Sequence, residues 1–194
     1  MAKIKQTQKR INKELKSYQS NSDDNGNSVI NITVYNDNDF LSPYSTNNTE
    51  FLSEETATFL EHSAKVVPPK NPLHIRIHSN EIDDNEKVKY KKAIKNYYFH
   101  QLMEIQSMLK HNSIISLVFT ILSALIFILQ FSLIDTIVDI PTLSELINVI
   151  GWVFMWEAVD HFVIERGKIN RTKYRYLNLM EAKLTFVKLD TKNK

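Results

Sequence analysis

The feature that most constrains the fold is an uncharged apolar stretch, SIISLVFTILSALIFILQFSLI, at residues 113–134. As a helix rising about 1.5 Å per residue, it would extend over roughly 33 Å, close to the thickness of a bilayer's hydrocarbon core. The whole chain has a mean hydropathy of -0.28 and 24% charged residues, which is ordinary for a soluble protein. Because the apolar residues are concentrated in one place, this stretch predicts a transmembrane helix.

A second apolar stretch, residues 142–164, follows a short acidic turn at residues 135–141. The turn contains two aspartates and no lysine or arginine, whereas Lys110 precedes the first span and Arg166 and Lys168 follow the second. By the positive-inside rule, the basic flanks stay in the cytoplasm and the acidic turn lies on the other side. The sequence therefore predicts a two-pass hairpin in the plasma (inner) membrane, with both termini cytoplasmic.

The end of the second span carries three ionisable residues, Glu157, Asp160 and His161, which share one helix face. In an antiparallel hairpin, Glu157 is expected at the depth of Thr120, and Asp160 at the depth of Ser116. Because lipid offers hydrogen-bond partners to neither helix, the two polar faces should meet. These five residues form the predicted intramembrane polar cluster.

Two interpretations of this cluster are open. Ionisable residues inside a membrane mark ion or proton pathways by default, which would make the cluster part of a conducting site. Alternatively, Trp152 and Trp156 flank the cluster and charged residues follow it, a pattern typical of side chains that anchor a helix at the head groups. A helix that begins its span early, near Pro141, would favour the second interpretation.

The residues before the spans predict a small cytoplasmic α/β region at 28–82. Two of its segments, VINITVY and PLHIRIH, alternate apolar and polar residues with the period of a strand. Between them, Ser53 is a candidate N-cap for a short helix that Pro68 and Pro69 end. The basic cytoplasmic segment at 165–194 ends in another alternating run, KLTFVKL. We therefore predict an α+β membrane protein: a two-helix transmembrane hairpin with a cytoplasmic α/β domain built from N- and C-terminal segments.

Two further segments complete the predicted organisation. Residues 1–27 form a basic arm with too few apolar residues to offset the entropy of ordering. We expect a weak, transient helix followed by a disordered linker, with a solvated tail favoured over contact with anionic head groups. Residues 83–112 predict a juxtamembrane helix that joins the first span. Its Lys87, Lys91 and Lys95 would lie roughly 25 Å or more from the span, beyond a Debye length of about 8 Å. This distance favours a protein partner or a solvated surface over contact with lipid.

The polar face of PLHIRIH holds His74, Arg76 and His78. A metal-binding row is one interpretation, but the two histidines are too widely spaced to share an ion without a third ligand from elsewhere. A solvated sheet face is the favoured interpretation.

Three segments, FLSPYST, PLHIRIHSNEID and WVFMWEAVDHFVIER, resemble a family of small, uncharacterised bacterial membrane proteins with two spans near the C-terminus. The resemblance covers about residues 38–187 and leaves out the N-terminal arm. It implies the two-span architecture, and it brings no activity, cofactor or catalytic residue.

Composition narrows the class of function. The 24 basic and 22 acidic residues nearly cancel, which argues against a nucleic-acid partner, and a chain without cysteine has no thiol chemistry. Three glycines and no recognisable catalytic motif argue against an enzyme, a cofactor or a small-molecule substrate. We expect a membrane-anchored interaction or sensory module whose partners are the lipid bilayer and either a second copy of the chain or another protein. An oligomeric pore or ion pathway lined by the intramembrane acids is the alternative, since one hairpin cannot enclose a channel.

Overall fold

The computed structural model describes residues 2–19, 23, 26–46, 49–68, 71–80, 82–132 and 141–189. The chain divides into two compact units. We call Met1–Leu102 together with Lys173–Lys194 the sheet unit, and Met103–Thr172 the hairpin unit. The predicted turn at 135–141 lies outside the described residues, apart from Pro141.

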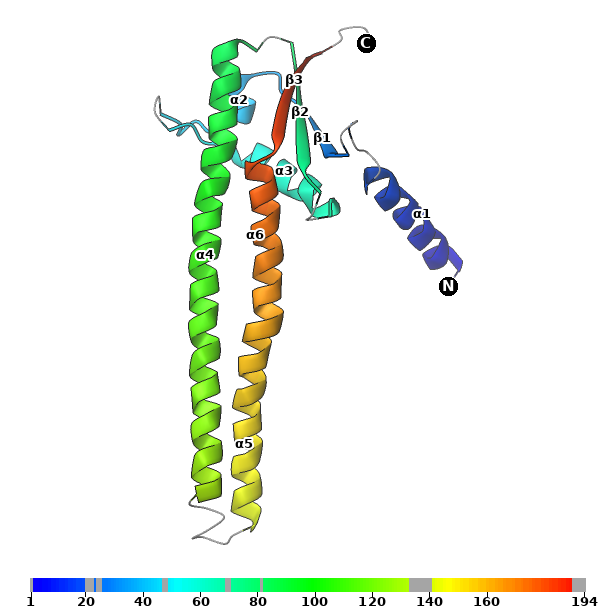
Figure 1. The fold of residues 1–194 in the computed structure, drawn as a ribbon. Coiled ribbons are helices and arrows are strands. Elements are labelled where there is room, and N and C mark those ends of the chain that lie inside the picture. Colours follow the sequence, from blue (N-terminus) through cyan, green and yellow to red (C-terminus); the bar gives the residue numbers. More distant parts are fainter. Residues whose placement is uncertain are drawn as a thin grey trace. The chain divides into compact units, whose positions relative to one another are not determined.

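The sheet unit is built around three parallel strands in the order β1-β2-β3 (Figure 1). They are β1 (Ser28–Thr33), β2 (Leu73–Ser79) and β3 (Lys183–Lys188). Ile75 at the centre of β2 pairs with Ile30 of β1 and Leu184 of β3. This pairing confirms that the α+β domain is built from both ends of the chain, because β3 joins strands more than one hundred residues earlier.

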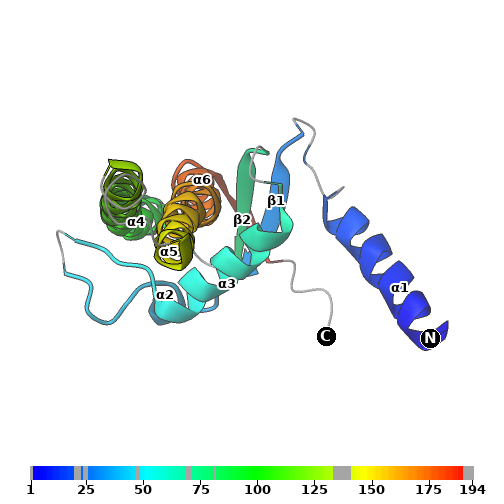
Figure 2. The same cartoon turned by 90° about the horizontal axis from the view of Figure 1, so that it is seen from below.

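One face of the sheet carries the core. The helix α3 (Glu54–Val66) lies against this face (Figure 2), and the Ser53 hydroxyl accepts a hydrogen bond from the Thr56 N–H as its N-cap. The short helix α2 (Asp37–Phe40) lies between β1 and α3. Its Phe40 is fully buried and stacks on Tyr90 with ring centroids 4.2 Å apart. One apolar anchor among polar residues is therefore enough to order this segment.

The N-terminal arm contains the expected helix, and most of the linker expected after it lies outside the described residues. Ala2–Gln19 form the helix α1, in which Arg10 and Glu14 pair one turn apart. Asp23 is buried and bonded to His74, and Asn27 donates its backbone N–H and its side-chain amide to the Asp23 carboxylate.

Two long helices, each interrupted only by a change of helix type, form the hairpin unit and continue into the sheet unit. The first is α4 (Asp84–Leu129), which unites the predicted segments 83–112 and 113–134 and ends in a π turn at 130–132. The second consists of α5 (Pro141–Val159), the π-helical turn η2 (Asp160–Glu165) and α6 (Arg166–Met180). It continues past the predicted end of the span at 164, because no proline follows there. Both are long and apolar enough to cross a membrane.

Candidate functional site

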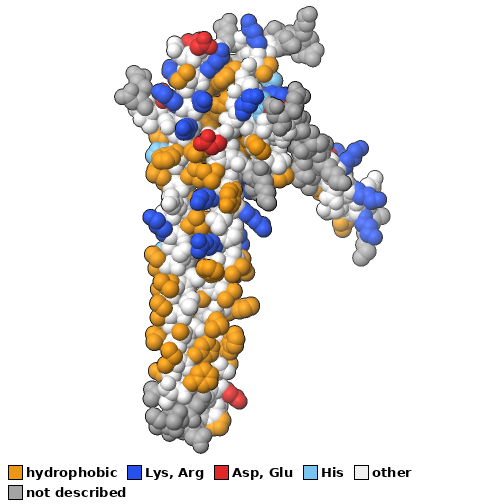
Figure 3. Space-filling view, in the orientation of Figure 1, with side chains coloured by type: hydrophobic (Ala, Val, Ile, Leu, Met, Phe, Trp, Pro, Cys, Tyr) orange, Lys and Arg blue, Asp and Glu red, His pale blue; other side chains and the backbone are white. Residues whose placement is uncertain are grey.

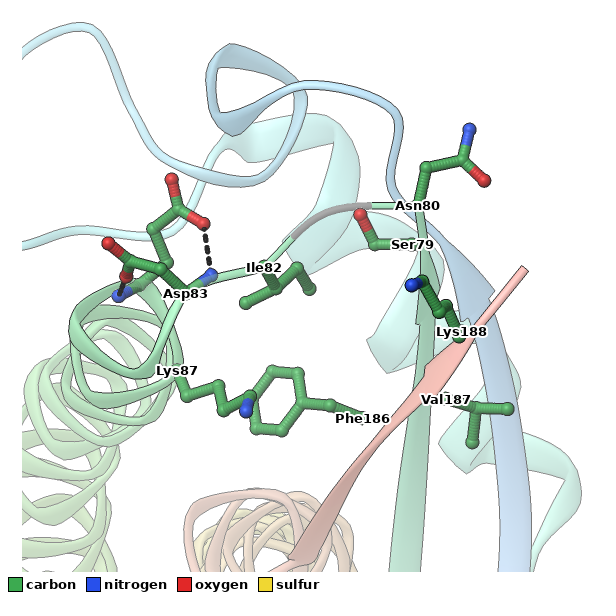
Figure 4. Close-up of a pocket in the computed structure, with 9 residues that line it drawn as sticks. Ser79, Asn80, Ile82, Asp83, Lys87, Phe186, Val187 and Lys188 are labelled. Atoms are coloured by element: carbon green, nitrogen blue, oxygen red, sulfur yellow. Dashed lines mark hydrogen bonds between the residues drawn. The ribbon is translucent and has the colours of Figure 1, made fainter.

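A groove runs beside β3 in the sheet unit, and we call it the β3 groove. Its first part is a cavity of about 670 Å³ at the carboxyl ends of β2 and β3 (Figure 4), lined by Ser79, Asn80, Ile82, Asp83, Glu86, Lys87, Phe186, Val187 and Lys188. Its second part, about 560 Å³, is lined by Lys87, Val88, Lys91, Ile94, Lys95 and Met180 through Leu184, with Phe186. Lys87 and Phe186 line both parts, so the two cavities adjoin. The volumes are typical of ligand pockets.

The three predicted interaction lysines lie together in this groove. Lys87, Lys91 and Lys95 are one turn apart on α4 and line the second part. The strand β3 adds Lys183 and Lys188, which the sequence reasoning missed. The sequence shows a lysine at each end of KLTFVK, which could have pointed to these two residues. Only the strand order, however, places Lys183 and Lys188 beside α4.

Most acidic groups next to the groove are already engaged. Asp83 and Glu86 form a capping box, in which the Asp83 N–H donates to Glu86 Oε2 (2.9 Å) and the Glu86 N–H donates to Asp83 Oδ1 (2.7 Å). Lys87 Nζ donates to Asp84 Oδ1 at 2.7 Å, and this bond lowers the pKa of the Asp84 carboxyl. Lys91, Lys95, Lys183 and Lys188 make no ion pair with any described residue. The surface of the groove is therefore basic.

The hairpin unit joins its helices through small and polar residues. Ser116 Oγ donates to the Ala158 carbonyl and Ser123 Oγ donates to the Gly151 carbonyl, both at 3.0 Å. Each pair is spaced by seven residues along its helix, so the same contact repeats after two turns. Gln130 Nε2 reaches Ser144 Oγ at 3.4 Å. Small residues in these positions let the backbones approach closely, as in membrane helix pairs.

His161 is the one ionisable residue of the predicted cluster that lies in this helix contact. Its Nδ1 is 2.8 Å from Asn112 Oδ1, and Asn112 Nδ2 donates to the His161 carbonyl at 2.7 Å. That carbonyl also accepts the Arg166 N–H, because the π turn shifts the helical bond by one residue. The His161 ring stacks on Phe119 at 6.0 Å between centroids. The sequence reasoning missed Asn112, which precedes the apolar stretch by one residue.

The structure separates the other members of the predicted cluster. Glu157 is exposed and lines a shallow hollow of about 510 Å³ with Val149, Trp152, Val153 and Trp156. Asp160 is half-buried, and neither carboxylate makes a hydrogen bond or ion pair with a described residue. Thr120 is exposed but lines a cavity of about 320 Å³ between the two helices with Ser116 and Ala158, and it donates to the Ser116 carbonyl of its own helix. Of the five predicted residues, Ser116 and His161 thus bond across the helix contact, Thr120 lies at its edge, and Glu157 faces outward.

A buried polar chain crosses the other face of the sheet. His74 Nδ1 is 2.8 Å from Asp23 Oδ2, and His74 Nε2 is 2.8 Å from Thr185 Oγ1. The order of carboxylate, imidazole and hydroxyl resembles that of a catalytic triad. However, the His74 and Asp23 side chains are each only 6% exposed, so the arrangement fits a structural link between three segments. No group of metal ligands occurs among the described residues.

A tyrosine cluster lies where α4 and α6 meet inside the sheet unit. The Tyr98 and Tyr176 rings are 5.6 Å apart, and Tyr176 Oη donates to Glu61 Oε2 at 3.4 Å. Burial, reinforced by the Glu61 charge, raises the pKa of Tyr176 to about 12, and it raises the pKa of Tyr98 further. Both phenols therefore stay protonated at neutral pH.

No protein-family model, curated protein or solved structure matches the chain. The resemblance to a bacterial two-span family thus stays a prediction.

Proposed function

We propose that the chain is a two-pass protein of the inner membrane, with both termini in the cytoplasm, that holds the sheet unit at the membrane as an interaction module. The observation that carries the proposal is the surface of the hairpin unit. In the most apolar 18-residue segment of the first helix, only 17% is buried inside the protein. In the corresponding segment of the second helix, 11% is buried. Figure 3 shows hydrophobic side chains covering the visible face of this hairpin. Lipid is the environment that accommodates such a surface.

The inside of the hairpin supports the same conclusion. Its buried polar side chains, Asn112, Ser116, Ser123 and Gln130, make hydrogen bonds across the helix contact, while the outward positions are mostly apolar. A water-soluble helix pair has the opposite arrangement, with its apolar residues inside. In a bilayer, polar groups turned toward each other avoid an unsatisfied bond in hydrocarbon.

The level of the ionisable residues favours anchoring over conduction. His161 pairs with Asn112, which directly precedes the uncharged stretch, so His161 and the adjacent Asp160 lie level with the start of the first span. The helix α5 begins at Pro141, and about 20 residues are needed to cross a hydrocarbon core. A span that begins at Pro141 therefore also ends near Asp160 and His161. Glu157 lies one turn deeper beside Trp152 and Trp156, two residues typical of the head-group region.

The interaction role is supported by the β3 groove. A basic groove with an apolar floor is a feature of surfaces that bind acidic chains, and the sheet unit has no arrangement of metal ligands among its described residues. Two helices, α4 and α6, lead from this unit into the hairpin. A partner bound in the groove would therefore be held next to the membrane.

Single-cysteine labelling tests the threading, because the natural chain has no cysteine. A membrane-impermeant maleimide is applied to intact and to lysed cells. Thr142→Cys, at the start of α5, should react in intact cells, and Tyr44→Cys, highly exposed in the sheet unit, should react only after lysis. Leu125→Cys, outward-facing in the first span, should react in neither, because a thiol in hydrocarbon does not ionise. Labelling of Tyr44→Cys in intact cells would overturn the proposal.

The pore alternative is tested in proteoliposomes containing the full chain. We expect no ion or proton flux above that of protein-free vesicles, because Asp160 and His161 lie level with the start of the first span and not along its length. Flux that Glu157→Gln with Asp160→Asn removes would establish the alternative instead. A matched control, Glu145→Gln, changes an exposed acid at the opposite end of α5.

A further inference from the structure

The strand β3 has one unpaired edge. It is the last strand in the order β1-β2-β3, and no described residue pairs with its other side. The Leu189 N–H donates to the Ser79 carbonyl of β2. Because successive residues of a strand direct their backbone groups to alternate edges, the N–H and C=O groups of Leu184, Phe186 and Lys188 point to the unpaired edge. This edge is a template for a further strand.

The β3 groove runs along this edge. Leu184 and Phe186 belong to one face of the sheet, whereas Lys183 and Val187 belong to the other, and all four line the groove. A space lined by residues of both faces of a strand lies at the edge of that strand. In Figure 4 the Phe186 and Val187 side chains point to opposite sides of β3. The opposite wall is α4, which contributes Val88 and Ile94. The space next to β3 is thus bounded by a helix, and it has apolar contacts for a bound chain.

The charge of the groove selects what can occupy it. Four lysines without a described ion-pair partner line it, namely Lys91, Lys95, Lys183 and Lys188, and Glu181 is the one acid there that is not in the capping box. Lysines on an edge strand also discourage pairing between identical chains, which accounts for Lys183 and Lys188. That role does not account for Lys91 and Lys95, which come from α4 across the groove. These two lysines indicate attraction of an acidic chain.

We propose that the β3 groove binds an acidic, extended segment of a partner protein, which adds to the sheet as a fourth strand beside β3. Backbone hydrogen bonds to the outer edge of β3 provide affinity, and apolar side chains of the segment contact Val88, Leu184 and Phe186. Its carboxylates pair with the lysines of α4 and β3. The proposal rests on the interaction role above and names the class of partner.

The test uses the full chain in nanodiscs of phosphatidylcholine, which has no net charge. The probe is a fluorescein-labelled heptapeptide of alternating glutamate and valine, and binding is measured by fluorescence anisotropy at low salt. We expect saturable binding that weakens at least tenfold for the variant Lys91→Glu with Lys95→Glu. The matched control, Lys89→Glu with Lys92→Glu, makes the same charge change at exposed positions of α4 outside the groove and should bind within about twofold of the natural chain.

A second probe separates strand addition from charge attraction and needs no variant. The same peptide with every backbone amide N-methylated keeps its charge but has no N–H on either edge to donate to β3, so it should bind at least tenfold more weakly. Equal binding of the two peptides would overturn the proposal, as would no saturable binding to the natural chain or an equal loss in both lysine variants. The cysteine labelling is independent of these measurements. Failure of peptide binding with the expected labelling would refute only the acidic strand, whereas the reverse result would refute only the membrane threading.

Discussion

Replacing Gly151 with leucine is expected to destabilise the contact between the two helices of the hairpin. A Cβ atom at this position would lie 2.9 Å from Phe127 Cε1 and 3.2 Å from Ile126 Cγ2. The first distance is shorter than any ordinary carbon contact, so the ring or the helix must move. The Gly151 carbonyl accepts a hydrogen bond from the Ser123 hydroxyl at 3.0 Å, and this bond lengthens when the helices separate.

The magnitude follows from three effects. Overfilling a packed contact costs typically about 1–3 kcal/mol. Loss of one interhelical hydrogen bond in a membrane protein adds about 0.6 kcal/mol. Removing a glycine from a helix interior returns about 0.5–1 kcal/mol. The expected net loss is therefore about 1–3 kcal/mol.

Gly167 provides the matched control. It also lies inside a helix, but a Cβ there would meet no atom within 4 Å. Gly167→Leu should therefore show only the gain in helix propensity, about 0.5–1 kcal/mol. Stability is measured by titrating the full chain in mixed micelles with sodium dodecyl sulfate and following the emission of Trp152, whose ring is 6.1 Å from that of Phe127. Equal unfolding midpoints for the Gly151 and Gly167 variants would refute the reasoning.

Three further predictions concern the sheet unit and use thermal unfolding in detergent. Ser53→Ala removes the N-cap of α3 and should cost about 1 kcal/mol, whereas Ser53→Asp should retain most of the stability. Tyr176 keeps its proton in the folded state up to a pKa of about 12, while an unfolded tyrosine loses it near 10. Its contribution is therefore complete below pH 10 and is lost as the pH rises from 10 to 12, so Tyr176→Phe should flatten the alkaline fall in melting temperature. Thr185→Val leaves His74 Nε2 without its 2.8 Å partner and should cost about 1–3 kcal/mol, whereas Thr185→Ser should cost less.

The elements with strong periodicity could be predicted from the sequence. Both strands before the spans, the third strand and the N-cap at Ser53 follow from local patterns, and the structure has them. The pairing depth of the hairpin was also close, since Ser116 was expected beside Asp160 and bonds to Ala158 two residues away. Local patterns suffice here because each depends on the residue's immediate neighbours.

Features that depend on contacts between distant segments could not be predicted. A helical wheel places Glu157 and His161 on one face, but in the structure Glu157 is exposed while His161 contacts Asn112 of the other helix. In the sequence, Asn112 is simply a polar residue that precedes the span. Its role is evident only from the structure, in which it bonds to His161. The β3 groove likewise needs the strand order, which brings Lys183 beside lysines almost one hundred positions earlier.

The strand order has a consequence for how the chain is divided. Two parallel neighbours such as β2 and β3 need a crossover connection, usually one helix packed on the sheet. Here the connection contains the whole hairpin, but the sheet core uses only its two ends, as Tyr90, Ile94 and Tyr98 of α4 and Leu179 of α6 show. The residues at 103–172 belong to the other unit. The hairpin therefore occupies the position of an insertion within an ordinary crossover.

Removing residues 103–172 should accordingly leave a folded, soluble sheet unit. The Tyr98 and Tyr176 rings are 5.6 Å apart, so the cut ends of α4 and α6 lie close enough for a short glycine-serine linker between Leu102 and Lys173. We expect a monodisperse protein with a cooperative thermal transition and mixed helix and strand signals in circular dichroism. The Ile75→Ala variant of the shortened chain is the control, since it should unfold at lower temperature by loss of a fully buried side chain. An aggregated or unfolded shortened chain would mean that the sheet depends on the hairpin, because its own core is too small to offset the entropy of folding.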